Sequence, residues 1–144
     1  MGGSSLTVSP FNENVVLVVA GAMDSTNIDD GIQGIFRTLD GGNTWSQVRS
    51  HYTKRYNNTP GGDLIAFTGS NTVYAGTADE GLLRSTNGGT TWIQIATPTQ
   101  LGASTIEVLD VKVTGTSADG VYPKTLYVAT NNNSYPLRKV VDNG

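Results

Sequence analysis

Residues 34–48, with the sequence GIFRTLDGGNTWSQV, decide the fold because they recur at residues 81–95 as GLLRSTNGGTTWIQI. The two copies share Gly, Arg, a Gly-Gly pair, Thr-Trp and Gln at matching positions, and together they contain both Trp residues of the chain. The offset from residue 34 to residue 81 is a period of 47 residues. A fixed period of this length is typical of repeat proteins, so we expect the rest of the chain to follow the same unit.

Four short candidate strands make up each unit. An apolar segment precedes the repeated motif at residues 14–20 and 72–77, and a third such segment lies at residues 125–130. Another candidate strand comes before each of them, and the last of these alternates between apolar and polar residues with one slip at Leu109-Asp110. The expected strands are 5–9, 14–20, 34–39 and 44–48 in the first unit, 63–67, 72–77, 81–86 and 91–95 in the second, and 106–114, 125–130 and 136–141 in the third.

The composition favours an all-β chain. Charged residues are 15% of the sequence, against roughly 25% in an average soluble domain. Gly, Asn, Thr and Ser disfavour helix interiors, whereas Thr, Val, Ile and Tyr suit strands. Four short antiparallel strands per unit predict β-propeller blades, here about three, with the last incomplete. A solenoid is the alternative, although its repeats are usually shorter, and a two-sheet sandwich does not explain the repeat.

The expected domain organisation is one partial propeller over residues 1–144. Blade 1 covers about residues 5–48, blade 2 about 63–95 and blade 3 about 106–144. Propellers have roughly four to eight blades, and this sequence supplies about three. We therefore expect it to form either part of a larger propeller or a ring of several chains that associate through open blade edges. The first interpretation is favoured because the sequence stops inside the third copy of the turn motif.

The repeated turn resembles the Asp-box, also called the BNR repeat, whose pattern is Ser/Thr-x-Asp-x-Gly-x-Thr-Trp. The first copy matches in full, the second has Asn in place of Asp, and the third keeps only Asp and Gly, with Val140 in the Ser/Thr place. The matching residues are Thr38, Asp40, Gly42, Thr44 and Trp45, then Ser85, Asn87, Gly89, Thr91 and Trp92, and finally Asp142 and Gly144. Asp-box propellers include sialidases, xyloglucan-cleaving endoglucanases, sortilin-type receptors and photosystem II assembly factors, so the resemblance implies the fold and leaves several functions open.

The Asp-box residues are expected to be structural. An Asp or Asn beside Gly-Gly accepts backbone N–H bonds in a turn, and the Trp that follows covers the gap between sheets. The resemblance implies the same, because the Asp-box of known members lies on the rim, away from the active site. Arg37 and Arg84 recur at one strand position, so we interpret them as structural anchors and not as a sialidase carboxylate clamp.

The opposite face of the blades is the expected functional face. Successive strands alternate in direction, so the turns that follow the first and third strands of a unit share one face, and the loops that follow the second and fourth share the other. Long, chemically varied loops on a rigid scaffold are typical of binding sites. These loops carry the acidic residues Asp24, Asp29, Asp30, Asp79 and Glu80, together with His51, Tyr52, Arg55, Tyr56 and Tyr135.

Two of these carboxylates are the candidate catalytic residues. Paired carboxylates from neighbouring blades can act as acid and base in glycoside cleavage, and we assign these roles to Asp79 and Asp30. Residues 76–81 loosely resemble the segment of xyloglucan-cleaving propellers that holds a catalytic Asp, with one residue inserted. The remaining loop residues named above are expected to bind ligand, with the aromatic rings stacking on sugars. A solvated turn at Asp79-Glu80 is the structural alternative.

Charge and cysteine content exclude other classes of protein. The net charge of −3 and the pI of about 4.9 argue against nucleic acid as a partner. The chain has no Cys, which excludes a thiol nucleophile and a Cys-based zinc site. The Asp residues at 24, 29 and 30 lack regular calcium-loop spacing, so we predict no metal and no cofactor. The longest apolar run, residues 15–23, is too short to insert in a membrane, and the N-terminus lacks a signal peptide.

The sequence supports two functions. The first is an extracellular glycan-active or glycan-binding Asp-box propeller, resembling a glycoside hydrolase, whose partner is a polysaccharide or other glycan. The second is a non-catalytic propeller at the cell surface that binds a protein, as a receptor, adhesin or assembly factor does. Whether the chain is an enzyme depends on whether two loop carboxylates face each other in a cleft, which the sequence leaves open.

Overall fold

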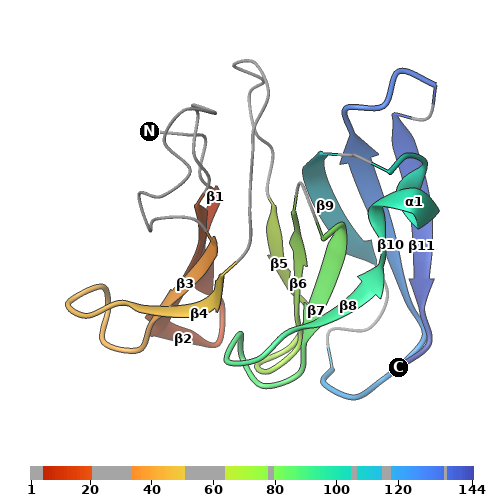
Figure 1. Ribbon diagram of the computed structural model, residues 1–144. Helices are drawn as coiled ribbons and strands as arrows, with labels where there is room; N and C mark the ends of the chain where they lie inside the picture. The colour runs from red at the N-terminus through yellow and green to blue at the C-terminus, as the bar shows by residue number, and fades with distance from the viewer. Residues whose placement is uncertain are drawn as a thin grey trace, which may run out of the picture.

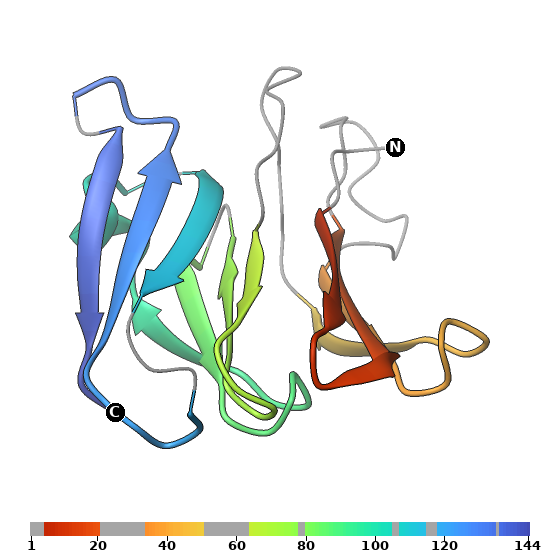
Figure 2. The same ribbon diagram turned by 180° about the vertical axis from the view of Figure 1, so that it is seen from behind.

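The computed structural model describes residues 5–20, 34–50, 64–77, 80–104, 107–114, 118–134 and 136–144. These residues form three antiparallel sheets that stand side by side (Figures 1 and 2). In each sheet, strands that follow one another along the chain are also neighbours in space. We call the sheets blades 1, 2 and 3.

The strand bounds follow the repeat. Blade 1 contains β1 (Ser5–Ser9), β2 (Asn12–Ala20), β3 (Gly34–Thr38) and β4 (Ser46–Ser50). Blade 2 contains β5 (Ile65–Phe67), β6 (Val73–Gly76), β7 (Leu82–Ser85) and β8 (Ile93–Ala96). Blade 3 contains β9 (Val108–Thr114), β10 (Lys124–Thr130) and β11 (Leu137–Asp142).

The first strands of the blades lie next to one another. Strand β1 contacts β5, and β5 contacts β9. The backbone N–H of Leu64, just before β5, donates to Ser5 Oγ of β1 at 2.9 Å. The chain therefore forms β-propeller blades, and the predicted all-β propeller fold is confirmed.

Two local features separate the structure from a plain strand-and-turn pattern. The predicted slip at Leu109-Asp110 is present, because Asp110 pairs with Ala129 while Val108 pairs with Thr130. A short helix, α1 (Pro98–Leu101), occupies the connection between β8 and β9, which the sequence pattern left as a loop. Thr97 caps this helix, since its side chain accepts from Gln100 N while the Gln100 side chain accepts from Thr97 N.

The core fills the spaces between blades. Leu17, Ile35, Tyr74, Leu83 and Leu126 are among its fully buried side chains. Two glycines allow the close approach of neighbouring blades. A Cβ at Gly76 of β6 would lie 2.3 Å from Cγ1 of Val108 in blade 3, and one at Gly89 would lie 2.8 Å from Leu17 in blade 1. Any larger residue at these positions would push two blades apart.

The turn between β3 and β4 is held by side-chain hydrogen bonds. The Thr38 hydroxyl donates to Asp40 Oδ1 at 2.7 Å, and Gly42 N donates to Thr38 Oγ1 at 3.0 Å. Asp40 accepts from Thr44 N at 2.9 Å and from the Thr44 hydroxyl at 2.6 Å. These bonds, above all those from Thr44, lower the pKa of Asp40 to about 2. Trp45 Nε1 closes the turn on Gly42 O at 3.0 Å.

The turn between β7 and β8 has the same hydrogen bonds, except that donor and acceptor are exchanged in one of them. Gly89 N donates to Ser85 Oγ, Thr91 N donates to Asn87 Oδ1, and Trp92 Nε1 donates to Gly89 O. The Asn87 amide donates to the Thr91 hydroxyl at 2.8 Å, whereas in the first turn the Thr hydroxyl is the donor. A hydroxyl can donate or accept, so Asn replaces Asp without loss of a bond.

Asp142 occupies a different place in the repeat from the one that the sequence suggested. It ends β11 opposite Lys124, as Thr38 ends β3 opposite Val16. Its Oδ1 accepts from Gly144 N, two residues on, as Thr38 Oγ1 accepts from Asp40 N. The structure thus places Asp142 at the Ser/Thr position, and the expected placement of Val140 there is two residues out of register.

Asp142 also joins blade 3 to blade 2. Its two oxygens accept from Arg84 Nη1 at 2.7 and 2.9 Å, and Oδ2 accepts from the Tyr74 hydroxyl at 2.6 Å. The Tyr122 ring lies 5.1 Å from the Arg84 guanidinium carbon. Burial raises the pKa of Asp142, but the hydrogen bonds from Tyr74 and Arg84 outweigh it and leave the pKa lowered. Arg84 is the anchor that the sequence predicted, with a partner on the next blade.

We expect Asp40→Asn to be tolerated and Asp40→Ala to lower the melting temperature by a few degrees. Asn keeps the acceptor for Thr44 N and can reverse the second bond as Asn87 does, while Ala removes both bonds. Thermal unfolding followed by circular dichroism checks this order. Equal melting temperatures for the two variants would show that the turn does not depend on these bonds.

We expect Asp142→Asn to destabilise the protein by roughly 3 kcal/mol at pH 7, because it leaves the Arg84 charge buried without its counter-ion. The folded-state pKa of Asp142 lies below its unfolded value. Its contribution is therefore complete above about pH 4 and is lost as the pH falls through the folded pKa. Urea unfolding at several pH values measures this, and the variant should lose less stability on acidification than the wild type. Parallel acid limbs would contradict the assignment.

Candidate functional site

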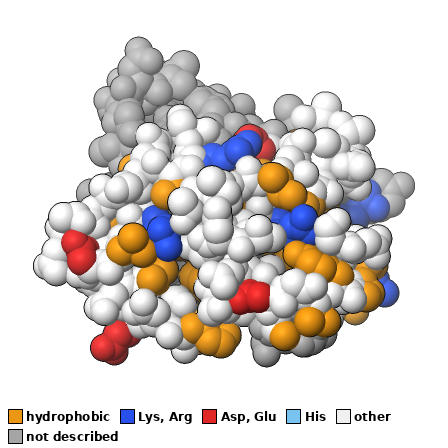
Figure 3. All heavy atoms as spheres, turned by 90° about the horizontal axis from the view of Figure 1, so that it is seen from below, with side chains coloured by type: hydrophobic (Ala, Val, Ile, Leu, Met, Phe, Trp, Pro, Cys, Tyr) orange, Lys and Arg blue, Asp and Glu red, His pale blue; other side chains and the backbone are white. Residues whose placement is uncertain are grey.

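The candidate functional face is the end of the blades that holds the described parts of three loops: those after β6, after β8 and after β10. In Figure 1, α1 and the loop from β10 to β11 lie at the upper end of the blades, and the turns from β3 to β4 and from β7 to β8 lie at the lower end. The two ends therefore separate the candidate loops from the turns that contain Asp40 and Asn87. Seen from below, the acidic and basic side chains of the described residues are scattered over the surface without a large cluster of either sign (Figure 3).

Most of the predicted site residues fall outside the described residues. The candidate catalytic Asp79 and Asp30 are among them. So are the expected ligand-binding residues Asp24, Asp29, His51, Tyr52, Arg55, Tyr56 and Tyr135. Glu80 is described, and it follows Asp79 directly in the sequence.

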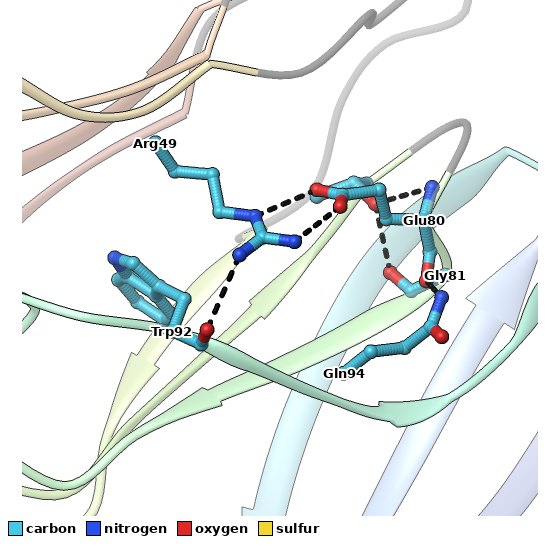
Figure 4. Close-up of polar contacts among 6 residues, drawn as sticks. Arg49, Glu80, Gly81, Trp92 and Gln94 are labelled. Carbon is cyan, nitrogen blue, oxygen red and sulfur yellow. Dashed lines mark hydrogen bonds and ion pairs between the residues drawn. The ribbon is translucent and has the colours of Figure 1, made fainter.

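Glu80 forms an ion pair with Arg49 across two blades (Figure 4). Arg49 Nε donates to Glu80 Oε2 at 2.9 Å, and Arg49 Nη2 donates to Glu80 Oε1. Arg49 Nη1 also donates to the backbone oxygen of Trp92 at 3.2 Å. Arg49 belongs to β4 of blade 1, and Glu80 belongs to the loop between β6 and β7 of blade 2. A two-point contact of this kind fixes the direction of both side chains.

The backbone around Glu80 is held as well. Glu80 N donates to Thr77 Oγ1 at 3.1 Å, and Glu80 O accepts from Gln94 Nε2 of β8 at 2.6 Å. Thr77 N donates to Gly81 O at 2.8 Å. Gly81 has φ of 73°, and a Cβ there would lie 2.4 Å from Ala96 O, so only Gly fits. The described residues on both sides of positions 78–79 are thus fixed by Arg49, Gln94 and β8.

This arrangement assigns Glu80 a structural role. Both of its carboxylate oxygens accept from a guanidinium that stays charged at all ordinary pH values. The ion pair is about three-quarters buried on each side. A carboxylate held in this way orients the backbone of the loop beside it. That Glu80 binds a ligand stays a prediction.

Glu107 is a carboxyl group of the loop face that the sequence pattern did not select. It precedes β9 and is 4% exposed. Its N–H donates to Asn131 Oδ1 at 3.0 Å, and its carbonyl accepts from Asn131 N at 3.1 Å. The alternation of residues 106–114 placed Glu107 on the polar side of a strand. These backbone bonds join Glu107 to the loop between β10 and β11, a long-range contact that no local pattern could reveal.

The described residues contain neither a cluster of metal-ligating side chains nor a helix that could cross a membrane. No three His, Cys, Asp or Glu side chains among them gather closely enough to hold a metal ion. No helix in the described part of the chain is long and apolar enough to cross a membrane.

The three antiparallel sheets, each built from strands that follow one another along the chain, define the chain as β-propeller blades. Comparison with solved structures agrees with this fold. The GH74 enzyme of Niastella koreensis is similar over 97% of this chain and 21% of its own length, with a TM-score of 0.67 and 23% sequence identity. An ancestral GH74 enzyme is similar over 94% of this chain and 20% of its own length, with a TM-score of 0.49 and 22% identity.

No protein-family model matches the chain, and no curated protein matches it either. The chain spans about a fifth of the length of the GH74 enzymes to which it is similar. At these identities the likeness shows the fold alone.

We expect the Arg49–Glu80 pair to contribute a coupling energy of roughly 1 kcal/mol, because both groups retain some contact with water. A double-mutant cycle with Arg49→Met and Glu80→Gln measures it by urea unfolding. Hydrogen exchange of the Glu80 and Gly81 amides should accelerate in both single variants. Strict additivity of the two substitutions would show that the contact has no energetic weight.

Proposed function

We propose that these blades belong to a glycoside hydrolase-like Asp-box propeller that binds or cleaves a glycan at the loop face, outside the cell. The observation that carries the proposal is the likeness to a GH74 enzyme over nearly the whole of this chain. The two turns with the hydrogen bonds described above support their identification as Asp-boxes. Low charge and abundant Gly, Thr and Asn support the extracellular setting.

The proposed chemistry uses two carboxylates. One, as a carboxylic acid, protonates the glycosidic oxygen of the leaving sugar, and the other, as a carboxylate, attacks the anomeric carbon or activates a water molecule. Asp79 and Asp30 are the candidates. Asp79 lies in the sequence between Thr77 and Glu80, whose backbone is fixed by β8 and by Arg49. A rigid support of this kind suits a catalytic side chain.

The experiment compares Asp79→Asn and Asp30→Asn with the wild type on a panel of β-glucans, xyloglucan and sialylated glycans. Loss of an acid or base lowers the rate by about 100-fold or more, so each variant should lose nearly all turnover on whichever glycan the wild type cleaves. Glu13→Gln is the matched control, because Glu13 is an exposed carboxylate on β2. Full activity in both Asp variants would overturn the assignment of these residues.

A non-catalytic role is the second candidate. One observation favours it: the carboxylate of Glu80, which the sequence placed among the ligand-binding residues, already forms an ion pair with Arg49. In this case no glycan of the panel is hydrolysed by the wild type. A protein partner would then protect residues 21–33 and 49–62 from hydrogen exchange.

A further inference from the structure

Asn87 and Gly88 form an Asn-Gly sequence in the turn between β7 and β8. Gly88 has a φ of 64°, in the left-handed region that favours glycine. The turn between β3 and β4 has a similar conformation at Gly41, with a φ of 69°, but there the preceding residue is Asp40. Because the backbone of the second turn requires Gly at position 88, an Asn at position 87 necessarily creates an Asn-Gly sequence.

An Asn-Gly sequence can lose ammonia without an enzyme. The backbone nitrogen of the Gly attacks Cγ of the Asn side chain, a C–N bond forms, and the bond from Cγ to Nδ2 breaks. Nδ2 leaves as ammonia together with the proton of the Gly amide. Water then opens the cyclic imide and leaves either aspartate or isoaspartate at the position of the Asn. Gly favours this attack because it has no Cβ to obstruct the approach of its nitrogen.

The folded chain keeps the attacking nitrogen engaged. Gly88 N donates to Asn71 O, in the turn between β5 and β6, at 2.8 Å. That turn is held in its place by blade 3, because Asn71 N and Thr72 N donate to the carboxylate of Asp119 at 3.0 and 2.7 Å. A backbone amide in such a bond reacts through local opening of the structure. Attack on Asn87 therefore requires the bond from Gly88 N to Asn71 O to open.

The second turn can hold an aspartate at position 87 without rearrangement. Asn87 Oδ1 accepts from Thr91 N at 2.8 Å and from the Ser85 hydroxyl at 3.0 Å, and Asn87 Nδ2 donates to the Thr91 hydroxyl at 2.8 Å. In an aspartate an oxygen replaces Nδ2, and the Thr91 hydroxyl would donate to it, as the Thr44 hydroxyl donates to Asp40 Oδ2 at 2.6 Å. Isoaspartate lengthens the main chain by one carbon atom and so cannot keep these bonds.

A partly buried guanidinium lies beside this turn. A Cβ at Gly88 would lie 3.5 Å from Nη2 of Arg37, which belongs to β3 of blade 1. Arg37 Nε is buried without a hydrogen-bond partner in the described part of the chain. Arg84, at the same place in blade 2, has the carboxylate of Asp142 as its partner. A partly desolvated charge is stabilised by a nearby opposite charge, so a carboxylate in the second turn would favour the packing of Arg37 against it.

We propose that Asn87 is a site of spontaneous deamidation, accessible when Gly88 N separates from Asn71 O, and that its aspartyl product strengthens the contact between blades 1 and 2 through Arg37. The reaction would give the second turn the carboxylate that the first turn already has in Asp40. Because ammonia is lost, the modification would proceed in one direction and accumulate with the age of the protein.

The first experiment measures the stability of the product through Asn87→Asp. We expect this variant to melt roughly 1 to 3 °C above the wild type, because it adds a partly exposed ion pair. The gain should disappear when the same substitution is made in an Arg37→Met background, with Arg37→Met alone as the reference. It should also shrink at high salt, which screens the pair. Thermal unfolding followed by circular dichroism measures all four proteins.

The second experiment measures the reaction itself. The wild type is aged at mildly alkaline pH, and peptide mapping by mass spectrometry follows the conversion of Asn87. The folded protein should convert at least about ten times more slowly than the chain in urea. Asp119→Ala should accelerate conversion in the folded protein, because it releases the turn that contains Asn71. Glu13→Gln, which replaces an exposed carboxylate on β2, is the control and should convert like the wild type.

Three results would overturn the proposal. One is an Asn87 that stays unchanged in the folded wild type and in Asp119→Ala while it is fully converted in urea. The second is conversion at the same rate in the folded protein and in urea, which would show that the bond from Gly88 N to Asn71 O does not control the reaction. The third is a melting temperature for Asn87→Asp that is no higher than that of the wild type, or equally raised with and without Arg37.

Discussion

Each blade of this protein depends on its neighbour to cover one face of its sheet. Blade 2 lies between the other two, and every residue of β6 and β7 is buried. The two Trp residues of the repeat show the consequence most directly. Trp92 of blade 2 is 6% exposed, while Trp45, at the same place in blade 1, is 44% exposed. Since hydrophobic burial is the main favourable term in folding, packing of one blade against the next contributes to the stability of the repeat.

Polar contacts between blades are less regular than the apolar ones. Arg84 reaches Asp142 of the next blade. Arg37, at the same place in blade 1, lies near Gly88, since a Cβ there would be 3.5 Å from its Nη2, and its Nε is buried without a hydrogen-bond partner in the described part of the chain. The position of Asp142 is filled by Ser85 in blade 2, so Arg37 lacks the matching carboxylate, and desolvation lowers its pKa. Asp119 joins blade 3 to blade 2 at yet another place, accepting from Ser70 Oγ and Thr72 N.

The features that sequence reasoning predicted are those with a local signal. The period-2 alternation marked β9 and its bulge at Leu109-Asp110, and the Gly-Gly turns marked the hairpins that contain Asp40 and Asn87. The helix α1 had a signal of its own in Thr97-Pro98-Thr99-Gln100, a capping box with Pro at its first position, but four residues are too few for a periodic pattern.

The features that the sequence could not provide depend on contacts between distant residues. The place of Asp142 follows from its pairing with Lys124 and from Arg84, and not from the spacing of Asp and Gly. Arg49 and Glu80 are separated by 31 residues and lie in different blades. Glu107 is joined through its backbone to Asn131, in the loop that follows β10. Each of these side chains lies on or near a boundary between elements, where single-sequence patterns carry no information about the partner.

Blade packing and the loop face are consequently coupled. The residues on either side of positions 78–79 are fixed from two directions, by Gln94 within blade 2 and by Arg49 from blade 1. A shift of blade 1 relative to blade 2 would move Arg49 and with it Glu80, because a two-point guanidinium contact transmits both position and orientation. The space between these blades is set by close approaches such as that of Leu17 to Gly89, at the opposite end from the loops. Since close-packed interiors yield little to strain, a substitution at Gly89 would disturb the loop face through rigid displacement of a blade, without touching any residue of that face.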